Sequence, residues 1–159
     1  MRALLLALLV IASPAWAQGY FGASIGQTKA GDKNDTAVRG FAGYQFTPSF
    51  AIEAGYQDLG NASFNSRDAS ITAGDLSFVG TLELGNRYGM LGRFGFYRAE
   101  TQDLGTAHGP IYGLGFSYEL THSATFRLEW QRYAKLGPGT QPTLSMDVFS
   151  IAALYRFSN

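Results

Sequence analysis

Apolar and polar residues alternate with a period of two from about residue 19 to the end of the chain, and glycine and aromatic residues are frequent throughout. Such alternation is typical of β-strands, whereas an amphipathic helix repeats every three to four residues. The pattern therefore predicts an all-β chain. We expect eight strands, over residues 19–27, 37–47, 49–58, 70–83, 87–99, 110–120, 124–134 and 145–157.

Short turns and longer polar segments alternate between the predicted strands. The turns contain Gly, Pro, Asn and Ser, which favour tight connections. Short turns at one end and long loops at the other are typical of bacterial outer-membrane barrels. The predicted turns are residues 47–49, 84–87 and 121–123, and the predicted loops are residues 28–35, 58–68, 100–109 and 135–143.

The apolar face of the strands carries 17 of the 22 aromatic residues that follow Ala17. An eight-stranded barrel is just wide enough to be filled by ordinary side chains, so it has little room for so many rings. The alternative, a β-sandwich with its aromatic residues inside, would expose a glycine-rich face. We therefore expect a closed, antiparallel, up-and-down transmembrane β-barrel with outward aromatic residues, namely Phe21, Tyr44, Phe46, Phe50, Tyr56, Phe78, Tyr88, Phe94, Phe96, Tyr112, Phe116, Tyr118, Phe126, Trp130, Phe149, Tyr155 and Phe157.

The opposite face is polar or small and predicts a polar lumen. Buried charges persist only with partners. We interpret the charges there as ion pairs that fill the lumen, and the functional alternative is a constriction that conducts when the pairs rearrange. The predicted lumen ion-pair network comprises Arg39, Glu53, Arg93, Glu119, Arg127, Glu129 and Arg156.

The first 17 residues have the features of a signal peptide. Arg2 precedes an apolar run over residues 3–12, and small residues surround Trp16 before Gln18. The run is shorter than the roughly 20 residues of a membrane-spanning helix. We expect cleavage after Ala17, which leaves one barrel domain over residues 18–159.

Charge and composition exclude several functions. The 12 basic and 12 acidic residues leave no net charge that would attract nucleic acid. Cysteine is absent and there are two histidines, so we expect no disulfide, metal or other cofactor. His122 and Ser123 are the only adjacent base and nucleophile, and neighbours in a turn seldom meet an orienting carboxylate. We therefore predict no enzymatic activity.

Five stretches resemble, in their order and spacing, the N-terminal transmembrane domain of outer membrane protein A and its small barrel relatives. They are residues 22–27, 43–48, 53–56, 127–131 and 154–157. The resemblance covers the chain after residue 17 and implies an outer-membrane location. It also implies that the final aromatic residues, Tyr155 and Phe157, form the signal read by the outer-membrane assembly machinery.

The same family holds acidic and basic side chains inside its barrel, and Glu53 and Arg127 match such positions. The family's other partners, on the fourth and sixth strands, correspond to Thr81 and Ser117, where this chain departs from the pattern. Outer membrane protein A continues into a periplasmic peptidoglycan-binding domain. This sequence ends after the last strand, so we do not expect cell-wall anchoring.

Together these observations predict a non-enzymatic, monomeric outer-membrane protein with a role in envelope integrity or surface interaction. Its expected partners are outer-membrane lipids, lipopolysaccharide and the assembly machinery. The alternatives are a small, weakly conducting pore, a lipid-modifying enzyme and a soluble periplasmic lipid carrier. Binding would reside in the loops, where the candidate contact residues are Lys29, Lys33, Asn61, Phe64, Arg67, His108 and Lys135.

Overall fold

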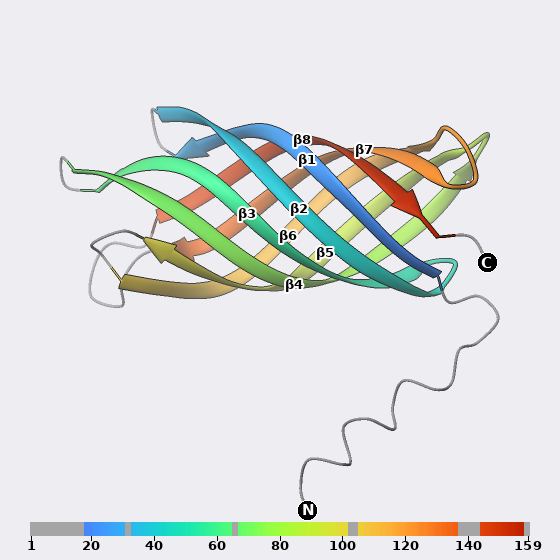
Figure 1. Ribbon diagram of the computed structural model, residues 1–159, viewed down its shortest axis with the longest axis horizontal. Helices are drawn as coiled ribbons and strands as arrows, with labels where there is room; N and C mark the ends of the chain where they lie inside the picture. Colours follow the sequence, from blue (N-terminus) through green and yellow to red (C-terminus); the bar gives the residue numbers. More distant parts are fainter. Residues whose placement is uncertain (1–17, 31–32, 65–66, 102–104, 137–143, 158–159) are drawn as a thin grey trace, which may run out of the picture.

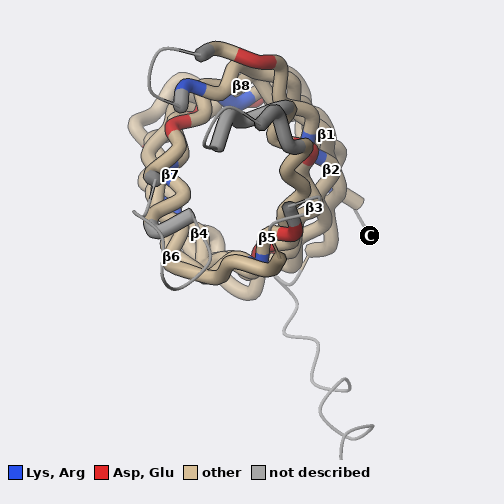
Figure 2. The backbone as a smooth tube through the Cα atoms, turned by 90° about the vertical axis from the view of Figure 1, so that its left-hand side faces the viewer, with Lys and Arg blue, Asp and Glu red and all other residues tan. Residues whose placement is uncertain are grey.

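Eight antiparallel strands follow one another around a closed barrel in the computed structural model (Figures 1 and 2). The structure describes residues 18–30, 33–64, 67–101, 105–136 and 144–157, so the predicted signal peptide lies outside the described residues. The predicted fold class is confirmed. The strands are β1 (Gln18–Ala30), β2 (Lys33–Thr47), β3 (Phe50–Phe64), β4 (Arg67–Gly85), β5 (Tyr88–Thr101), β6 (Gly105–Glu119), β7 (Ala124–Leu136) and β8 (Leu144–Arg156).

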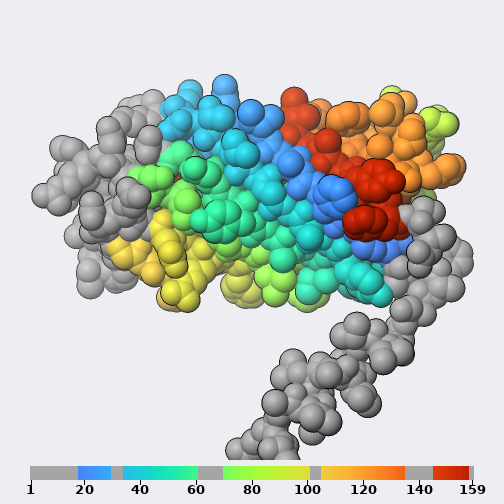
Figure 3. All heavy atoms as spheres, viewed as in Figure 1, coloured from blue at the N-terminus to red at the C-terminus, as the bar shows by residue number. Residues whose placement is uncertain are grey.

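The barrel closes where β8 pairs with β1. Their register runs from Tyr20 opposite Arg156 to Lys29 opposite Asp147, and the Phe157 amide donates to the Gly19 carbonyl at 2.9 Å. The closure is visible in Figure 3, where the blue surface of β1 adjoins the red surface of β8. Closure leaves the sheet without an unpaired edge.

The two ends of the barrel differ. The start of β1 and the end of β8 lie at the same end as the β2–β3, β4–β5 and β6–β7 connections (Figure 1), and we call this the turn end. The opposite end is the loop end. Among the described residues, no helix is long and apolar enough to cross a membrane.

At the loop end, the strands extend further than the sequence predicted. For example, β3 continues to Phe64 and β6 begins at Gly105. The predicted loops were wrong in extent, because Gly, Asp and Thr suggest a loop locally, whereas a closed barrel continues its ladder wherever neighbouring backbones pair. The residues predicted in loops that instead lie in strands are Lys29, Lys33, Asn61, Phe64, Arg67, His108 and Lys135.

The predicted aromatic face lies on the outside of the barrel. Of the 17 residues, 16 are exposed, and Trp130 is half-buried against its neighbours. Four other rings, those of Tyr20, Phe41, Tyr97 and Tyr133, are buried inside. The alternation therefore separates an aromatic exterior from a filled interior.

The β4–β5 turn places two residues in the left-handed region of backbone conformation. Asn86 has φ 52° and Arg87 has φ 70°, between Gly85 and Tyr88, which pair across the hairpin. A two-residue turn with positive φ at both positions favours Asn followed by Gly. Arg87 therefore occupies a position that suits glycine better.

We expect Arg87→Gly to raise the free energy of unfolding by up to about 1 kcal/mol, because glycine adopts this conformation without the steric cost of a Cβ. Urea titration of the lipid-reconstituted protein measures the change. Arg87→Ala is the matched control, since it removes the same side chain, including a 3.3 Å hydrogen bond from Nη1 to the Leu120 carbonyl, but keeps the strain. Equal stability of the two variants would contradict the explanation.

Candidate functional site

Six charged side chains from five strands meet in the middle of the lumen, and we call them the central ion cluster. None is more than 7% exposed. Three are positive and three are negative, so the cluster is neutral as a whole. It comprises Arg39 of β2, Glu53 of β3, Asp75 of β4, Arg93 of β5, and Arg127 and Glu129 of β7.

Glu53 is the hub of the cluster. Its Oε1 accepts hydrogen bonds from Arg39 Nη1 at 2.9 Å and from Arg93 Nη2. Its Oε2 accepts from Arg127 Nη1 and from the Tyr20 hydroxyl, both at 3.0 Å. One fully buried carboxylate therefore ties together four strands besides its own.

The other two carboxylates complete the cluster. Asp75 receives Arg39 Nη2 at 2.8 Å and Nε at 3.1 Å, a bidentate pair. Glu129 Oε2 lies 3.1 Å from Arg93 Nη2, and Glu129 Oε1 lies 3.6 Å from Arg127 Nη1. Each arginine thus contacts at least two carboxylates, which offsets the cost of removing its charge from water.

The predicted network divides into two parts. Arg39, Glu53, Arg93, Arg127 and Glu129 are brought together in the central ion cluster. The other two predicted members form a separate pair in which Arg156 Nη1 lies 3.3 Å from Glu119 Oε1. They are the last residues of β8 and β6, at the turn end. Because a strand rises about 3.3 Å per residue, they lie several residues along their strands from the level of the central ion cluster. This spacing keeps them from the centre.

Two members of the site, Asp75 and Tyr20, were missed by the sequence analysis. Asp75 has the same inward parity as Ser77, whose hydroxyl donates to it at 3.2 Å, so the period of two contained the signal. Asp75 supplies the acidic partner on β4. Thr81 and Ser117, which correspond to the family's partners, line the interior near the turn end instead.

Glycines make room for the large side chains of the cluster. A Cβ on Gly55 would overlap the guanidinium of Arg39, and one on Gly43 would overlap the ring of Tyr20. Both glycines lie in strand positions that face inward. The interior is therefore filled by a few long side chains that lie across positions with no side chain of their own.

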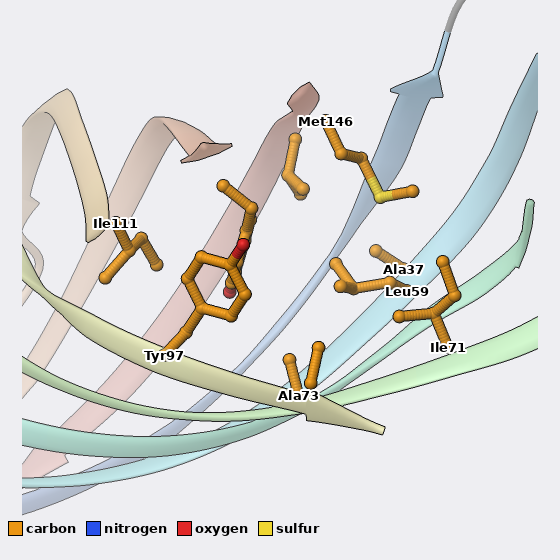
Figure 4. Packing of buried hydrophobic residues seen from close by; sticks show 10 residues of the cluster. Ala37, Leu59, Ile71, Ala73, Tyr97, Ile111 and Met146 are labelled. Atoms are coloured by element: carbon orange, nitrogen blue, oxygen red, sulfur yellow. The ribbon is translucent and has the colours of Figure 1, made fainter. Parts of the chain in front are cut away.

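The lumen is apolar at the loop end, which corrects the prediction of a polar lumen throughout. Ten buried residues converge there, as Figure 4 shows for Ile71, Ile111 and Met146. The Tyr97 and Tyr133 rings pack edge to face at 5.1 Å, and Tyr133 donates to Gln57 Oε1 at 2.6 Å. We call this layer the outer apolar tier. Its members are Ala37, Leu59, Ile71, Ala73, Tyr97, Ala99, Ile111, Tyr133, Met146 and Val148.

A polar vestibule of about 660 Å³ opens at the turn end. Glu83, Arg87, Glu119 and Arg156 line it, and it reaches inward as far as Tyr20 and Arg127. The central ion cluster therefore adjoins open space on the turn side. On the loop side it is covered by the outer apolar tier.

The turn between β6 and β7 contains the candidate base and nucleophile, His122 and Ser123. His122 is exposed in the β6–β7 turn, and no hydrogen bond joins it to Ser123 among the described residues. The Ser123 amide instead donates to Thr121 Oγ1 at 3.3 Å. Within the same residues, no cluster of three His, Cys, Asp or Glu side chains has the geometry of a metal site.

Residues 3–157 match the family model described as the outer membrane protein beta-barrel domain. The chain belongs to this family. The predicted resemblance and outer-membrane location are therefore confirmed, and the aromatic exterior faces lipid. No curated protein matches the sequence.

Solved structures of small outer-membrane barrels share the fold. Neisserial surface protein A has a TM-score of 0.68 at 14% identity, over 89% of this chain and 97% of that one. Ail of Yersinia pestis has a TM-score of 0.58 at 12% identity, again over 89% and 97%. OprG of Pseudomonas aeruginosa has a TM-score of 0.60 at 16% identity, over 91% and 97%.

The lipid-facing surface of this outer-membrane barrel contains the predicted assembly signal. Tyr155 and Phe157 are both about half exposed on the outside, with exposed fractions of 49% and 54%. Their ring centroids lie 5.9 and 5.4 Å from that of Phe21 on β1. The two terminal aromatic residues therefore lie at the seam where the barrel closes.

We expect Glu53→Gln to lower the free energy of unfolding by about 3 to 5 kcal/mol, because it leaves three buried guanidiniums with two carboxylates. Glu119→Gln is the matched control. It breaks a pair in which the Glu119 side chain is 42% exposed, so the expected loss is below about 1 kcal/mol. Urea unfolding in lipid vesicles compares the two, and equal losses would contradict the central role of Glu53.

We also expect Gly55→Ala to destabilise the barrel by about 1 to 3 kcal/mol, because the added methyl displaces a guanidinium that Glu53 and Asp75 hold in place. Gly40→Ala adds the same methyl on the outer face of β2, where no atom lies within 4 Å. That variant should match or slightly exceed the wild type in the same titration. A comparable loss in both would show that interior crowding is not the cause.

Proposed function

We propose that this outer-membrane barrel is a sealed, non-conducting and non-enzymatic protein that contributes to envelope integrity and offers its loop end for surface interactions. The observation that carries the proposal is the filling of the lumen by two successive layers. The central ion cluster occupies the middle, and the outer apolar tier lies between it and the loop end.

The two layers oppose ion passage by different physical means. To open the central ion cluster, several charge-assisted hydrogen bonds must break at once in a site of low dielectric constant. The polar side-chain groups of the outer apolar tier are the hydroxyls of Tyr97 and Tyr133, which donate to the Ala134 carbonyl and to Gln57 Oε1. The tier therefore offers little to replace the water around a passing ion, and hydrophobic constrictions close by dewetting. Six of its side chains have no exposed surface, namely those of Leu59, Ile71, Ala99, Ile111, Tyr133 and Val148.

The proposed absence of enzymatic activity is supported by the described residues at the ends of the barrel. The His122 and Ser123 pair has no orienting carboxylate bonded to it among those residues. A lipid-modifying activity requires a base within hydrogen-bond reach of a nucleophile. We therefore propose that the protein acts as a membrane-embedded barrel and not as a catalyst.

A role in surface interaction is supported by two relatives in fold. One is a surface protein of Neisseria, and the other is the attachment invasion locus protein of Yersinia pestis, which has also been solved with the heparin analogue sucrose octasulfate. On this chain, Lys29 and His108 are exposed on the outside near the loop end. We propose that they face lipopolysaccharide or another anionic surface.

The remaining partners follow from the same arrangement. We propose that the outer-membrane assembly machinery recognises the aromatic pair Tyr155 and Phe157 at the barrel seam. One chain supplies every charge of the central ion cluster and closes the barrel, which supports a monomer.

A small pore is the second candidate, because the vestibule already reaches Arg127 from the turn end. Planar-bilayer recording separates the two proposals. We expect the wild type to stay silent, and we expect both Glu53→Gln and the double variant Tyr133→Gly, Met146→Gly to stay silent, since one layer remains in each. The triple combination should conduct. Steady single-channel steps from the wild type would overturn the sealed barrel in favour of the pore.

A further inference from the structure

An apolar groove of about 630 Å³ runs along the lipid-facing surface over β6, β7, β8 and β1. The side chains around it include Leu114, Phe116, Leu128, Phe149, Ile151 and Ile25. All six are 57% to 61% exposed on the bare barrel. The groove therefore offers a hydrophobic channel of the kind that a hydrocarbon chain fills.

The strand register places a row of charged side chains directly above this groove, on its loop side. Lys29 of β1 lies opposite Asp147 of β8, and Asp147 lies opposite Arg132 of β7. One step further from the loop end, Gln27, Phe149 and Trp130 form the next row, and Ile25, Ile151 and Leu128 form the row after that. The surface thus changes from charged to apolar within two residues along β7 and β8, and within four along β1, where Gln27 lies between Lys29 and Ile25.

The charged row is held in a defined arrangement. Arg132 donates to Asp147 through Nε and Nη2, both at 2.7 Å, and Trp130 Nε1 donates to the same carboxylate at 3.2 Å. The Arg132 guanidinium also lies 5.6 Å from the centroid of the Trp130 ring. Asp147 therefore orients Arg132 and Trp130, and with Lys29 the row carries two positive charges and one negative charge.

We propose that this surface binds an anionic, phosphate-bearing lipid of the leaflet at the loop end, with the phosphate beside Lys29 and Arg132 and an acyl chain in the groove. The inference deepens the proposed function, on whose lipid-embedded barrel it rests. Cations that face a headgroup region favour an anionic lipid by about 1 kcal/mol each. An apolar groove continuous with a net positive row matches a lipid in both shape and charge.

The protein contains its own reporter of occupancy. It has two tryptophans, Trp16 in the predicted signal peptide and Trp130 in the groove. A Trp16→Phe background therefore makes Trp130 the single tryptophan, whether or not the signal peptide has been removed. Brominated acyl chains quench tryptophan fluorescence on contact, so the quenching of Trp130 measures which lipid fills the groove.

The experiment reconstitutes the protein in phosphatidylcholine vesicles that contain a minor fraction of either brominated phosphatidylglycerol or brominated phosphatidylcholine. We expect the phosphatidylglycerol to quench Trp130 more strongly at equal fraction. Lys29→Gln should lower that preference by about fivefold, which corresponds to one interfacial charge. Asp147→Asn should raise it, because the carboxylate that opposes the phosphate is neutralised.

Arg98→Gln is the matched control, since Arg98 is an exposed cation on β5 outside the groove. In this variant, the preference of Trp130 quenching for phosphatidylglycerol over phosphatidylcholine should equal that of the wild type. Equal quenching by the two lipids, or equal effects of Lys29→Gln and Arg98→Gln, would overturn the proposal. A folding defect lowers quenching by both lipids and cannot reproduce the opposite effects of Lys29→Gln and Asp147→Asn. Bilayer recording tests the sealed lumen separately, so either proposal can fail alone.

Discussion

The pairing of β8 with β1 is the interaction on which the rest of this barrel depends. In lipid, a strand edge without partners leaves amide and carbonyl groups that no water can satisfy, so a spanning sheet must close. Once the ladder is closed, successive side chains point alternately into lipid and into the lumen. Every further feature of the protein, from its aromatic exterior to its charged interior, follows from that division.

The small interior that results explains why one carboxylate has so many partners. Charges in a space this narrow have little access to water, so Glu53, Asp75 and Glu129 neutralise the three arginines within hydrogen-bond distance. Inward glycines such as Gly55 leave the space into which Arg39 extends. Charge balance and side-chain volume are therefore satisfied by the same set of residues.

The exterior and the interior are solvated by different media, and each boundary between media is marked by a change of residue type. On the outside, the charged row of Lys29, Asp147 and Arg132 gives way within four residues to the apolar row of Ile25, Ile151 and Leu128. On the inside, the central ion cluster gives way to the outer apolar tier toward the loop end. These two transitions match the outside of the barrel to the membrane around it and place two layers of different chemistry along its axis.

The sequence by itself determined the strand number, the outward aromatic face and most of the charged interior, because the alternation of period two is a local property of an extended chain. It placed Arg39, Glu53, Arg93, Arg127 and Glu129 on the inner face, and the same parity included Asp75. Only the tertiary structure decided which of these charges meet, since partners such as Glu53 and Arg127 are 74 residues apart in sequence and depend on strand register around the closed barrel. Register also separated Glu119 and Arg156 from the cluster, extended the strands into polar segments, and gathered Leu59, Ile71 and Tyr133 into the outer apolar tier.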